Sequence, residues 1–286
     1  METLLTTFVA AALAEFMQVA VWRGLDLTSI WVVADAKDRL HWAVLPMPLA
    51  GRATLLMVPP RLRPSLQSRH VSESIAGSLI ESGRRGVTLA QVLLDPEHRA
   101  VQRAVVESGF EEIAELVYLG RQVRNPINGR ILPDKYRLWR YDQSTHFRFG
   151  RCIERTYVDS LDCPRLNGRR ATEDIIDGHK AAGEFDPELW MLLSDVDDND
   201  LGVLLLNRLQ GRAGYELVYI GLTPEARGKG IADCLIRTAL NALAAEGGGQ
   251  IVTACDASNG PARKLYHRHG FAHLYARRAL VKELNP

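Results

Sequence analysis

The sequence predicts an α/β protein with two domains. Its 286 residues are more than one small domain needs, and a hydrophobic content of 47% is enough to fill two cores. Two segments near the C-terminus each have the pattern of a buried strand, a turn and a helix. A weaker form of the same pattern occurs in the first half of the chain. We therefore expect two similar domains in tandem.

The first C-terminal segment, residues 215–232, begins with an apolar strand in which Glu216 is the only acid. Thr223-Pro224 ends this strand, because proline has no N–H to donate to a ladder. Arg227-Gly-Lys-Gly-Ile-Ala232 then fits Arg-x-x-Gly-x-Ala and opens an apolar helix. A strand, a glycine-bearing turn and a helix N-terminus direct free backbone N–H groups at one point. The segment therefore predicts an anion-binding loop.

The second segment, residues 250–271, forms another strand, turn and helix. Asn259 is placed to cap the helix, Pro261 lies in its first turn, and Gly270 ends it. Phe271 then opens a final strand. The helix has the spacing Asn-x-x-Ala-x-x-x-Tyr and ends in Gly-Phe.

Together the two segments resemble the GNAT superfamily of N-acetyltransferases. The loop is neither a Walker loop nor a dinucleotide-binding fingerprint. The resemblance implies that each domain is a mixed, mostly antiparallel sheet flanked by helices, that acetyl-CoA is the cosubstrate, and that no metal is needed. Among tandem members, the strand pattern Glu-x-x-x-x-Gly-Leu, from Glu216 to Leu222, is similar to that of the mycothiol synthases.

The resemblance also implies where acetyl-CoA binds. The strand of Glu216 and the strand at residues 250–255 would splay apart, with the acetyl-CoA arm between them. The backbone of Ile220, Gly221 and Leu222 would pair with the pantetheine, and the loop would hold the pyrophosphate. Besides these three, the implied cofactor-binding set comprises Asn259 and the loop residues Arg227, Gly228, Lys229, Gly230, Ile231 and Ala232.

Acetyl transfer to an amine needs a neutral nucleophile, whereas a lysine-like amine has a pKa of about 10.4 and an α-amine one near 8. Glu216 is our candidate base, because strand alternation places it with Val218 and Ile220 and would desolvate it. We expect the N–H of Leu222 to meet the oxyanion. By the resemblance, Tyr266 protonates the leaving thiolate. A salt-bridged strand carboxylate and an ordinary helix-face tyrosine are the structural alternatives.

The first half of the chain repeats the second half in register. The Gly-Phe pairs at Gly109 and Gly270 lie 161 residues apart, and two strand-ending aspartates keep the same offset. We therefore expect a degenerate GNAT-like domain at residues 1–140 and a catalytic domain at residues 145–286.

The functional positions are not kept in the first copy. At the 161-residue offset, Glu216 corresponds to Leu55 and Tyr266 to Val105. Pro59-Pro60 stands where Ile220 and Gly221 stand in the second copy, and prolines cannot donate backbone hydrogen bonds to a cofactor. The first domain is therefore expected not to bind acetyl-CoA.

Other segments of the chain are assigned from periodicity and turn residues. We expect a crossover at 120–145 that contains a strand at 136–141, a first strand of the catalytic domain at 147–157, a helix at 172–182 and a hairpin turn at 195–200.

The polar stretch 159–168 would lie beside the acceptor in a GNAT fold, although a solvated loop is the alternative. His179, His267 and His269 have no partners at metal-binding spacing and are expected at surface positions of helices. The residues of this stretch that would contact the substrate are Ser160, Asp162, Cys163 and Asn167.

Composition narrows the remaining classes of function. A net charge of +1 gives no reason to expect nucleic acid or an anionic membrane as partner. The four cysteines lack Cys-x-x-Cys spacing and are expected to be free thiols. Residues 1–21 have the spacing of an amphipathic helix rather than a signal peptide or a membrane span, so we expect a cytoplasmic protein.

The sequence thus predicts an N-acetyltransferase that moves an acetyl group from acetyl-CoA to a primary amine of a small metabolite or a protein N-terminus, by direct attack in a ternary complex. Two alternatives stay open. One is a non-catalytic acyl-CoA-binding regulator, and the other is an aminoacyl or other acyl transferase.

Overall fold

The computed structural model describes residues 27–63, 66–129, 132–211 and 213–284. The described residues divide into two compact units: one contains residues 27–114 together with 276–284, and the other contains those between 115 and 275. The boundary expected between residues 140 and 145 therefore lies inside the second unit. The N-terminal helix expected over residues 1–21 lies outside the described residues.

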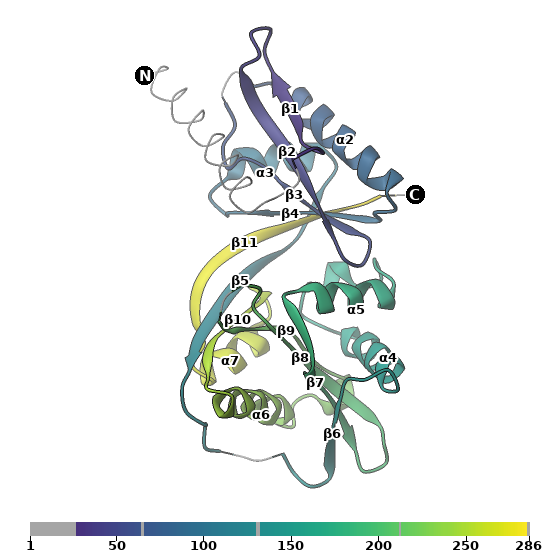
Figure 1. Cartoon of the computed structure of the whole chain (residues 1–286), viewed down its shortest axis with the longest axis vertical. Helices are drawn as coiled ribbons and strands as arrows, with labels where there is room; N and C mark the ends of the chain where they lie inside the picture. The colour runs from purple at the N-terminus through teal and green to yellow at the C-terminus, as the bar shows by residue number, and fades with distance from the viewer. Residues whose placement is uncertain (1–26, 64–65, 130–131, 212, 285–286) are drawn as a thin grey trace. The chain divides into compact units, whose positions relative to one another are not determined.

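The first unit contains a sheet with the strand order β1-β2-β3-β4-β11. The β3–β4 pair is parallel and the other neighbours are antiparallel. Helices α2 and α3 bury Ile75 and Val105 in one core with Trp42 of the sheet. Figure 1 shows these two helices beside strands β1 to β4. The elements are β1 (Trp31–Ala34), β2 (Leu40–Leu49), β3 (Ala53–Met57), α2 (Ser68–Arg84), β4 (Leu89–Leu94), α3 (Arg99–Glu107), the start of β5 (Glu111–Val123) and the end of β11 (Ala272–Glu283).

The second unit contains a sheet with the order β5-β10-β9-β8-β7-β6. Only the β9–β10 pair is parallel, so the expected mixed, mostly antiparallel sheet is confirmed. Figure 1 shows α4 and α5 on one side of this sheet and α6 and α7 on the other. Besides most of β5 and the start of β11, the elements are β6 (Tyr136–Arg140), α4 (His146–Tyr157), α5 (Thr172–Ala181), β7 (Glu184–Asp195), β8 (Asp200–Arg208), β9 (Tyr215–Leu222), α6 (Ile231–Ala245), β10 (Gly249–Asp256) and α7 (Gly260–Arg268).

The strand expected at residues 147–157 is wrong, because this segment is helix α4. β-Prone residues at alternate positions favour a strand there. The buried residues Phe149, Cys152, Ile153 and Thr156, however, recur at helical spacing. Packing of this face against the sheet outweighs local β-propensity.

Three other elements agree with the sequence. The expected helix at 172–182 is α5, and the expected hairpin turn at 195–200 joins β7 to β8, where the backbone N–H of Asn199 donates to Asp195 at 2.9 Å. The expected strand at 136–141 is β6. It pairs with β7 and is therefore the edge of the second sheet.

The repeat is visible in the structure. The order β3-α2-β4-α3-β5 matches β9-α6-β10-α7-β11. Helices α3 and α7 begin at Arg99 and Gly260, and strands β5 and β11 begin at Glu111 and Ala272. Both pairs of starting residues have the offset of 161 residues found in the sequence.

The last strand of each repeat joins the sheet built mainly from the other repeat. Residues 116–123 of β5 pair with β10, and residues 278–283 of β11 pair with β4. This exchange explains why the compact units do not follow the boundary between the sequence repeats.

Candidate active site

The parallel strands β9 and β10 pair over only three residues, with Tyr215–Leu217 opposite Ile251–Thr253. Beyond this stretch the two strands separate. A cavity of about 220 Å³ lies there, lined by Val218–Leu222 from β9 and Thr253–Cys255 from β10. The expected splay is therefore present.

A bulge in β9 shapes one wall of this cavity. Val218 is the extra residue at a register shift between β8 and β9. The N–H of Thr223 donates to the carbonyl of Leu201 at 2.9 Å, and hydrogen-bonded pairs alternate along an antiparallel ladder. The backbone N–H groups of Ile220 and Leu222 therefore face away from β8, toward the cavity.

Gly221 lies where the chain has no room for a side chain. A Cβ there would stand 2.6 Å from the Tyr219 hydroxyl and 2.7 Å from Oγ1 of Thr156. These two hydroxyl groups are hydrogen-bonded to each other at 2.7 Å. Glycine thus allows β9 and α4 to approach closely beside the cavity.

The loop between β9 and α6 has the geometry of an anion cradle. Gly228 and Gly230 have φ angles of +72° and +74°, a region that favours glycine, and Gly230 caps α6. Among the hydrogen bonds between described residues, none uses a backbone N–H of Gly228–Ala232 as donor. Lys229 is exposed at the same place. Free N–H groups, a helix N-terminus and a cation together suit a phosphate group.

The Arg227 side chain lines the cavity and also makes contacts that the sequence did not indicate. Its guanidinium donates to four backbone carbonyls: those of Thr156 (2.9 Å), Val158 (2.8 Å), Asp159 (3.1 Å) and Leu222 (3.1 Å). Three of these carbonyls belong to the end of α4, where a helix leaves carbonyl groups unpaired. The side chain therefore holds the end of α4 against the loop.

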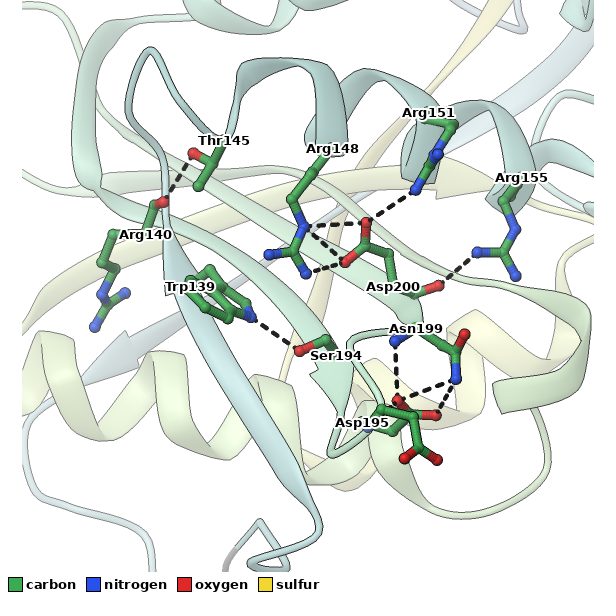
Figure 2. A network of polar contacts seen from close by, with 11 residues as sticks. Trp139, Arg140, Thr145, Arg148, Arg151, Arg155, Ser194, Asp195, Asn199 and Asp200 are labelled. Carbon is green, nitrogen blue, oxygen red and sulfur yellow. Dashed lines mark hydrogen bonds and ion pairs between the residues drawn. The ribbon is translucent and has the colours of Figure 1, made fainter.

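Helix α4 is also anchored to the start of β8, as Figure 2 shows. Asp200 is buried and accepts from Nη2 of Arg148 at 2.6 Å, while Arg151 lies 3.9 Å from the same carboxylate. Arg155 donates to the main-chain oxygen of Asp200 at 2.8 Å and pairs with Glu225 in the turn before the loop. The hydrogen bond to Asp200 raises the pKa of Arg148. The network fixes α4 beside the cradle.

Helix α7 contributes the opposite wall of the cavity. Asn259 caps it by accepting from the N–H of Ala262 at 3.1 Å, which confirms the predicted cap. Tyr266 is buried and lines the cavity, and burial raises the pKa of its hydroxyl. The hydroxyl therefore stays protonated at neutral pH.

Glu216 lies in the paired part of β9, opposite Asn207 of β8 and Val252 of β10. It is half-buried and is not among the residues that line the cavity. Asn207 donates to the main-chain oxygen of His179 at 2.7 Å, so this face of the sheet is the one that α5 covers. Residues directly opposite each other share a face, which places Glu216 on the α5 side.

A second cavity of about 180 Å³ lies on the same face. It shares Asp162, Val218 and Tyr219 with the first cavity. Cys163 and Asn167 of the 159–168 stretch line it, whereas Ser160 lines the first cavity. The loop that the sequence placed beside the acceptor therefore contributes to both cavities.

Two residues of the second cavity were missed or misplaced by the sequence analysis. Tyr219 lines both cavities, and burial raises the pKa of its hydroxyl. The surface position expected for His179 is wrong, because its Nε2 atom is buried. His179 follows Ile175 and Ile176 of α5 at helical spacing, and that apolar face was the available signal.

Among the residues that the structure describes, no group of three or more His, Cys, Asp or Glu side chains is arranged to hold a metal ion. The four cysteines are free thiols, as expected from the sequence. None of the described helices has the length and apolar character that crossing a bilayer requires.

Comparisons with known proteins support the family resemblance. Residues 155–271 match the acetyltransferase (GNAT) family. A mycothiol acetyltransferase of Clavibacter michiganensis subsp. michiganensis is 32% identical over 125 residues, which cover 41% of this chain and 40% of that protein. A mycothiol acetyltransferase of Arthrobacter sp. is 24% identical over 247 residues, which cover 83% of this chain and 72% of that protein. The alignment thus spans less than half the length of the first relative.

Solved structures show the same fold. A GCN5-related N-acetyltransferase of Sphaerobacter thermophilus superposes with a TM-score of 0.61 at 16% identity, covering 94% of this chain and 85% of that one. A tandem GNAT protein from the clavulanic acid biosynthesis pathway superposes with a TM-score of 0.53 at 13% identity, covering 90% of this chain and 83% of that one. The chain therefore has a tandem GNAT fold and resembles the mycothiol acetyltransferases in sequence.

Proposed function

We propose that the second unit transfers the acetyl group of acetyl-CoA to a primary amine, either of a small metabolite or of a protein N-terminus. The observation that supports this most strongly is the opening between β9 and β10, which leads to the cradle at the start of α6. Acetyl-CoA combines an extended arm carrying amide groups with a pyrophosphate. The unpaired strand edge and the free loop N–H groups match these two parts.

The donor would be held mainly by backbone. The edge at Ile220 and Leu222 pairs with the pantetheine amides, and the N–H groups of Gly228–Ala232 bind the pyrophosphate. Asn259 lines the cavity where the arm lies. Its side chain caps α7, so it fixes the cavity wall as well as contacting the arm.

The chemical step is direct attack by a neutral amine on the thioester carbon. The N–H of Leu222 meets the developing oxyanion. As the tetrahedral intermediate collapses, the C–S bond breaks and the Tyr266 hydroxyl gives its proton to the thiolate. Glu216, the base expected from the sequence, lies outside the first cavity and would reach the amine only through water.

The first unit is proposed not to bind acetyl-CoA. Its β2–β3 pairing runs from Leu45–Met57 to Leu49–Ala53 without a register shift, unlike the bulged β8–β9 pair. Pro59-Pro60 follows β3 at the position where β9 offers backbone donors to the arm.

The test is release of CoA thiol from acetyl-CoA in the presence of a panel of primary amines. Tyr266→Phe should lower kcat by about 10²–10⁴-fold while acetyl-CoA still binds, because only the proton donor is removed. If wild type and Tyr266→Phe bind acetyl-CoA equally well and neither acetylates any amine, the protein is instead a non-catalytic acyl-CoA-binding regulator.

A further inference from the structure

The second cavity adjoins the first cavity, with which it shares Asp162, Val218 and Tyr219. Tyr219 forms part of both cavities, and its hydroxyl is fixed by Thr156 at 2.7 Å. The Tyr157 ring meets the Tyr219 ring edge-on, with their centroids 5.8 Å apart. The cavity therefore has aromatic walls where it adjoins the first cavity.

His179 brings an unused hydrogen-bonding atom to this wall. Its ring stacks on Tyr219, with the ring centroids 5.4 Å apart and the planes at 21°. The Nε2 atom is buried and has no hydrogen-bond partner among the described residues. Such atoms are rare in folded proteins because burying an unpaired polar group costs free energy. A bound ligand with a polar hydrogen would satisfy this atom.

We propose that the second cavity receives the acceptor amine and that Nε2 of His179 accepts its proton. This inference rests on the proposed function. The acceptor is a primary amine with an apolar or aromatic portion, which would meet Leu166, Ile175, Val218 and the two tyrosine rings. Asp162, Asn167 and Arg170 form the polar part of the same lining.

Burial and the neighbouring Arg170 keep the ring of His179 neutral. Arg170 faces it from the segment before α5, while Asp162 and Cys163 line the same cavity from the loop after α4. On β9, Tyr219 stacks on the ring and Glu216 lies on the same face of the sheet. Burial and the nearby Arg170 guanidinium lower the pKa of His179 to about 4, so the ring is neutral near pH 7.

The step balances without any further reactant. The amine nitrogen attacks the thioester carbon, the C–N bond forms, and the carbonyl electron pair moves to oxygen. The nitrogen becomes acidic as it bonds to carbon, and its proton moves to Nε2 of His179. The C–S bond then breaks and Tyr266 protonates the sulfur. Exchange with solvent removes the proton from His179 and restores the one on Tyr266.

This assignment differs from the sequence-derived base in its geometry. His179 lines the second cavity directly, whereas Glu216 lines neither cavity. His179→Phe keeps an aromatic ring to stack on Tyr219 and removes both nitrogen atoms, at the cost of a ring that is larger by one atom. Glu216→Gln is the matched variant, because it removes a charge from the same face at nearly constant volume.

The experiment compares wild type, His179→Phe and Glu216→Gln with phenethylamine, n-butylamine and glucosamine as acceptors. We expect kcat/KM of His179→Phe to fall by about 100-fold or more, and that of Glu216→Gln by less than about tenfold. Acetyl-CoA affinity of His179→Phe should be unchanged, and its Tm unchanged or higher, because an unpaired buried atom is removed. The apolar and aromatic amines should be better substrates than glucosamine.

Activity of His179→Phe within about threefold of wild type would overturn the role of His179. A clear preference for glucosamine would overturn the acceptor class. Failure of wild type to bind acetyl-CoA or to acetylate any amine would be a failure of the proposed function. In that case, NMR of the His179 ring during titration with n-butylamine still decides whether the cavity binds amines. A shifted ring signal supports the cavity assignment, and an unchanged signal overturns it.

Discussion

Arg227 offers a sharp test of how the active site is built. The sequence motif predicts that the charge of Arg227 contributes to cofactor binding. In the structure, the Arg227 guanidinium donates to four backbone carbonyls at the ends of α4 and β9. Arg227→Met keeps most of the aliphatic contacts and removes all four hydrogen bonds. If the structural role dominates, this change should reduce stability more than affinity for acetyl-CoA.

The magnitude follows from the burial of the four bonds. The bonds to Leu222 and Thr156 are half-buried, while those to Val158 and Asp159 are exposed and contribute little. At the lower end of the range for charged hydrogen bonds, about 1.5 kcal/mol each, the two half-buried bonds contribute about 3 kcal/mol. For a domain of this size, that loss lowers Tm by about 6–12 °C.

Lys229→Met is the matched control, because Lys229 is exposed in the same loop. Thermal unfolding followed by circular dichroism gives stability, and calorimetric titration of acetyl-CoA at low and high salt gives affinity. Lys229→Met should leave Tm unchanged and weaken binding mainly at low salt. An unchanged Tm for Arg227→Met, together with a larger loss of affinity than for Lys229→Met, would refute the structural assignment.

Three further predictions concern packing, topology and pH. Gly221→Ala should lower the free energy of unfolding, measured with denaturant, by about 1–3 kcal/mol, because its Cβ must displace the Tyr219 hydroxyl and Thr156. An unchanged denaturation midpoint would contradict the close approach of β9 and α4. A fragment of residues 145–286 should be insoluble, because it lacks the β5 strand that covers the edge of β10; a soluble fragment that binds acetyl-CoA would argue against strand exchange. The pKa of His179 falls from its ordinary 6.5 to about 4 on folding, so the unfolded chain binds the proton first as pH drops. Wild type should therefore lose up to about 3 kcal/mol of stability between about pH 6.5 and pH 4, and His179→Phe should lack this loss.

Much of the fold could be predicted from the sequence, because the elements involved carry local signals. Thr223-Pro224 ends β9, and Asn259 caps α7 as its residue type predicts. The 161-residue offset also holds, since it depends on the spacing of turns and caps rather than on contacts. Such features are encoded within a few residues of where they act.

Features that depend on distant contacts could not be predicted. α4 resembles a strand in its local composition, and only the sheet it packs on selects a helix. The exchange of β5 and β11 has no local signature, because either strand could have closed its own sheet. The Arg227 guanidinium reaches carbonyls about 70 residues earlier in the chain, at Thr156 and Val158.

The candidate site was predicted best where backbone defines it. The glycines of the cradle and the edge of β9 are in the expected places. The side-chain contacts were harder to predict, because Tyr219 and His179 come from different elements and meet only after folding. Glu216 illustrates the converse: its position on β9 was clear, but its distance from the splay depends on where β9 and β10 stop pairing.

The most direct test of the central claim is calorimetric titration of acetyl-CoA into wild type, Gly228→Gln and Gly228→Glu. A Cβ at Gly228 meets no neighbour, and its φ of +72° strains both variants alike, so the pair differs mainly in charge. We predict one equivalent bound by wild type and at least about tenfold weaker binding by Gly228→Glu than by Gly228→Gln, because the carboxylate repels the pyrophosphate. Two equivalents, no binding by wild type, or equal affinities of the two variants would contradict a single acetyl-CoA site at this loop.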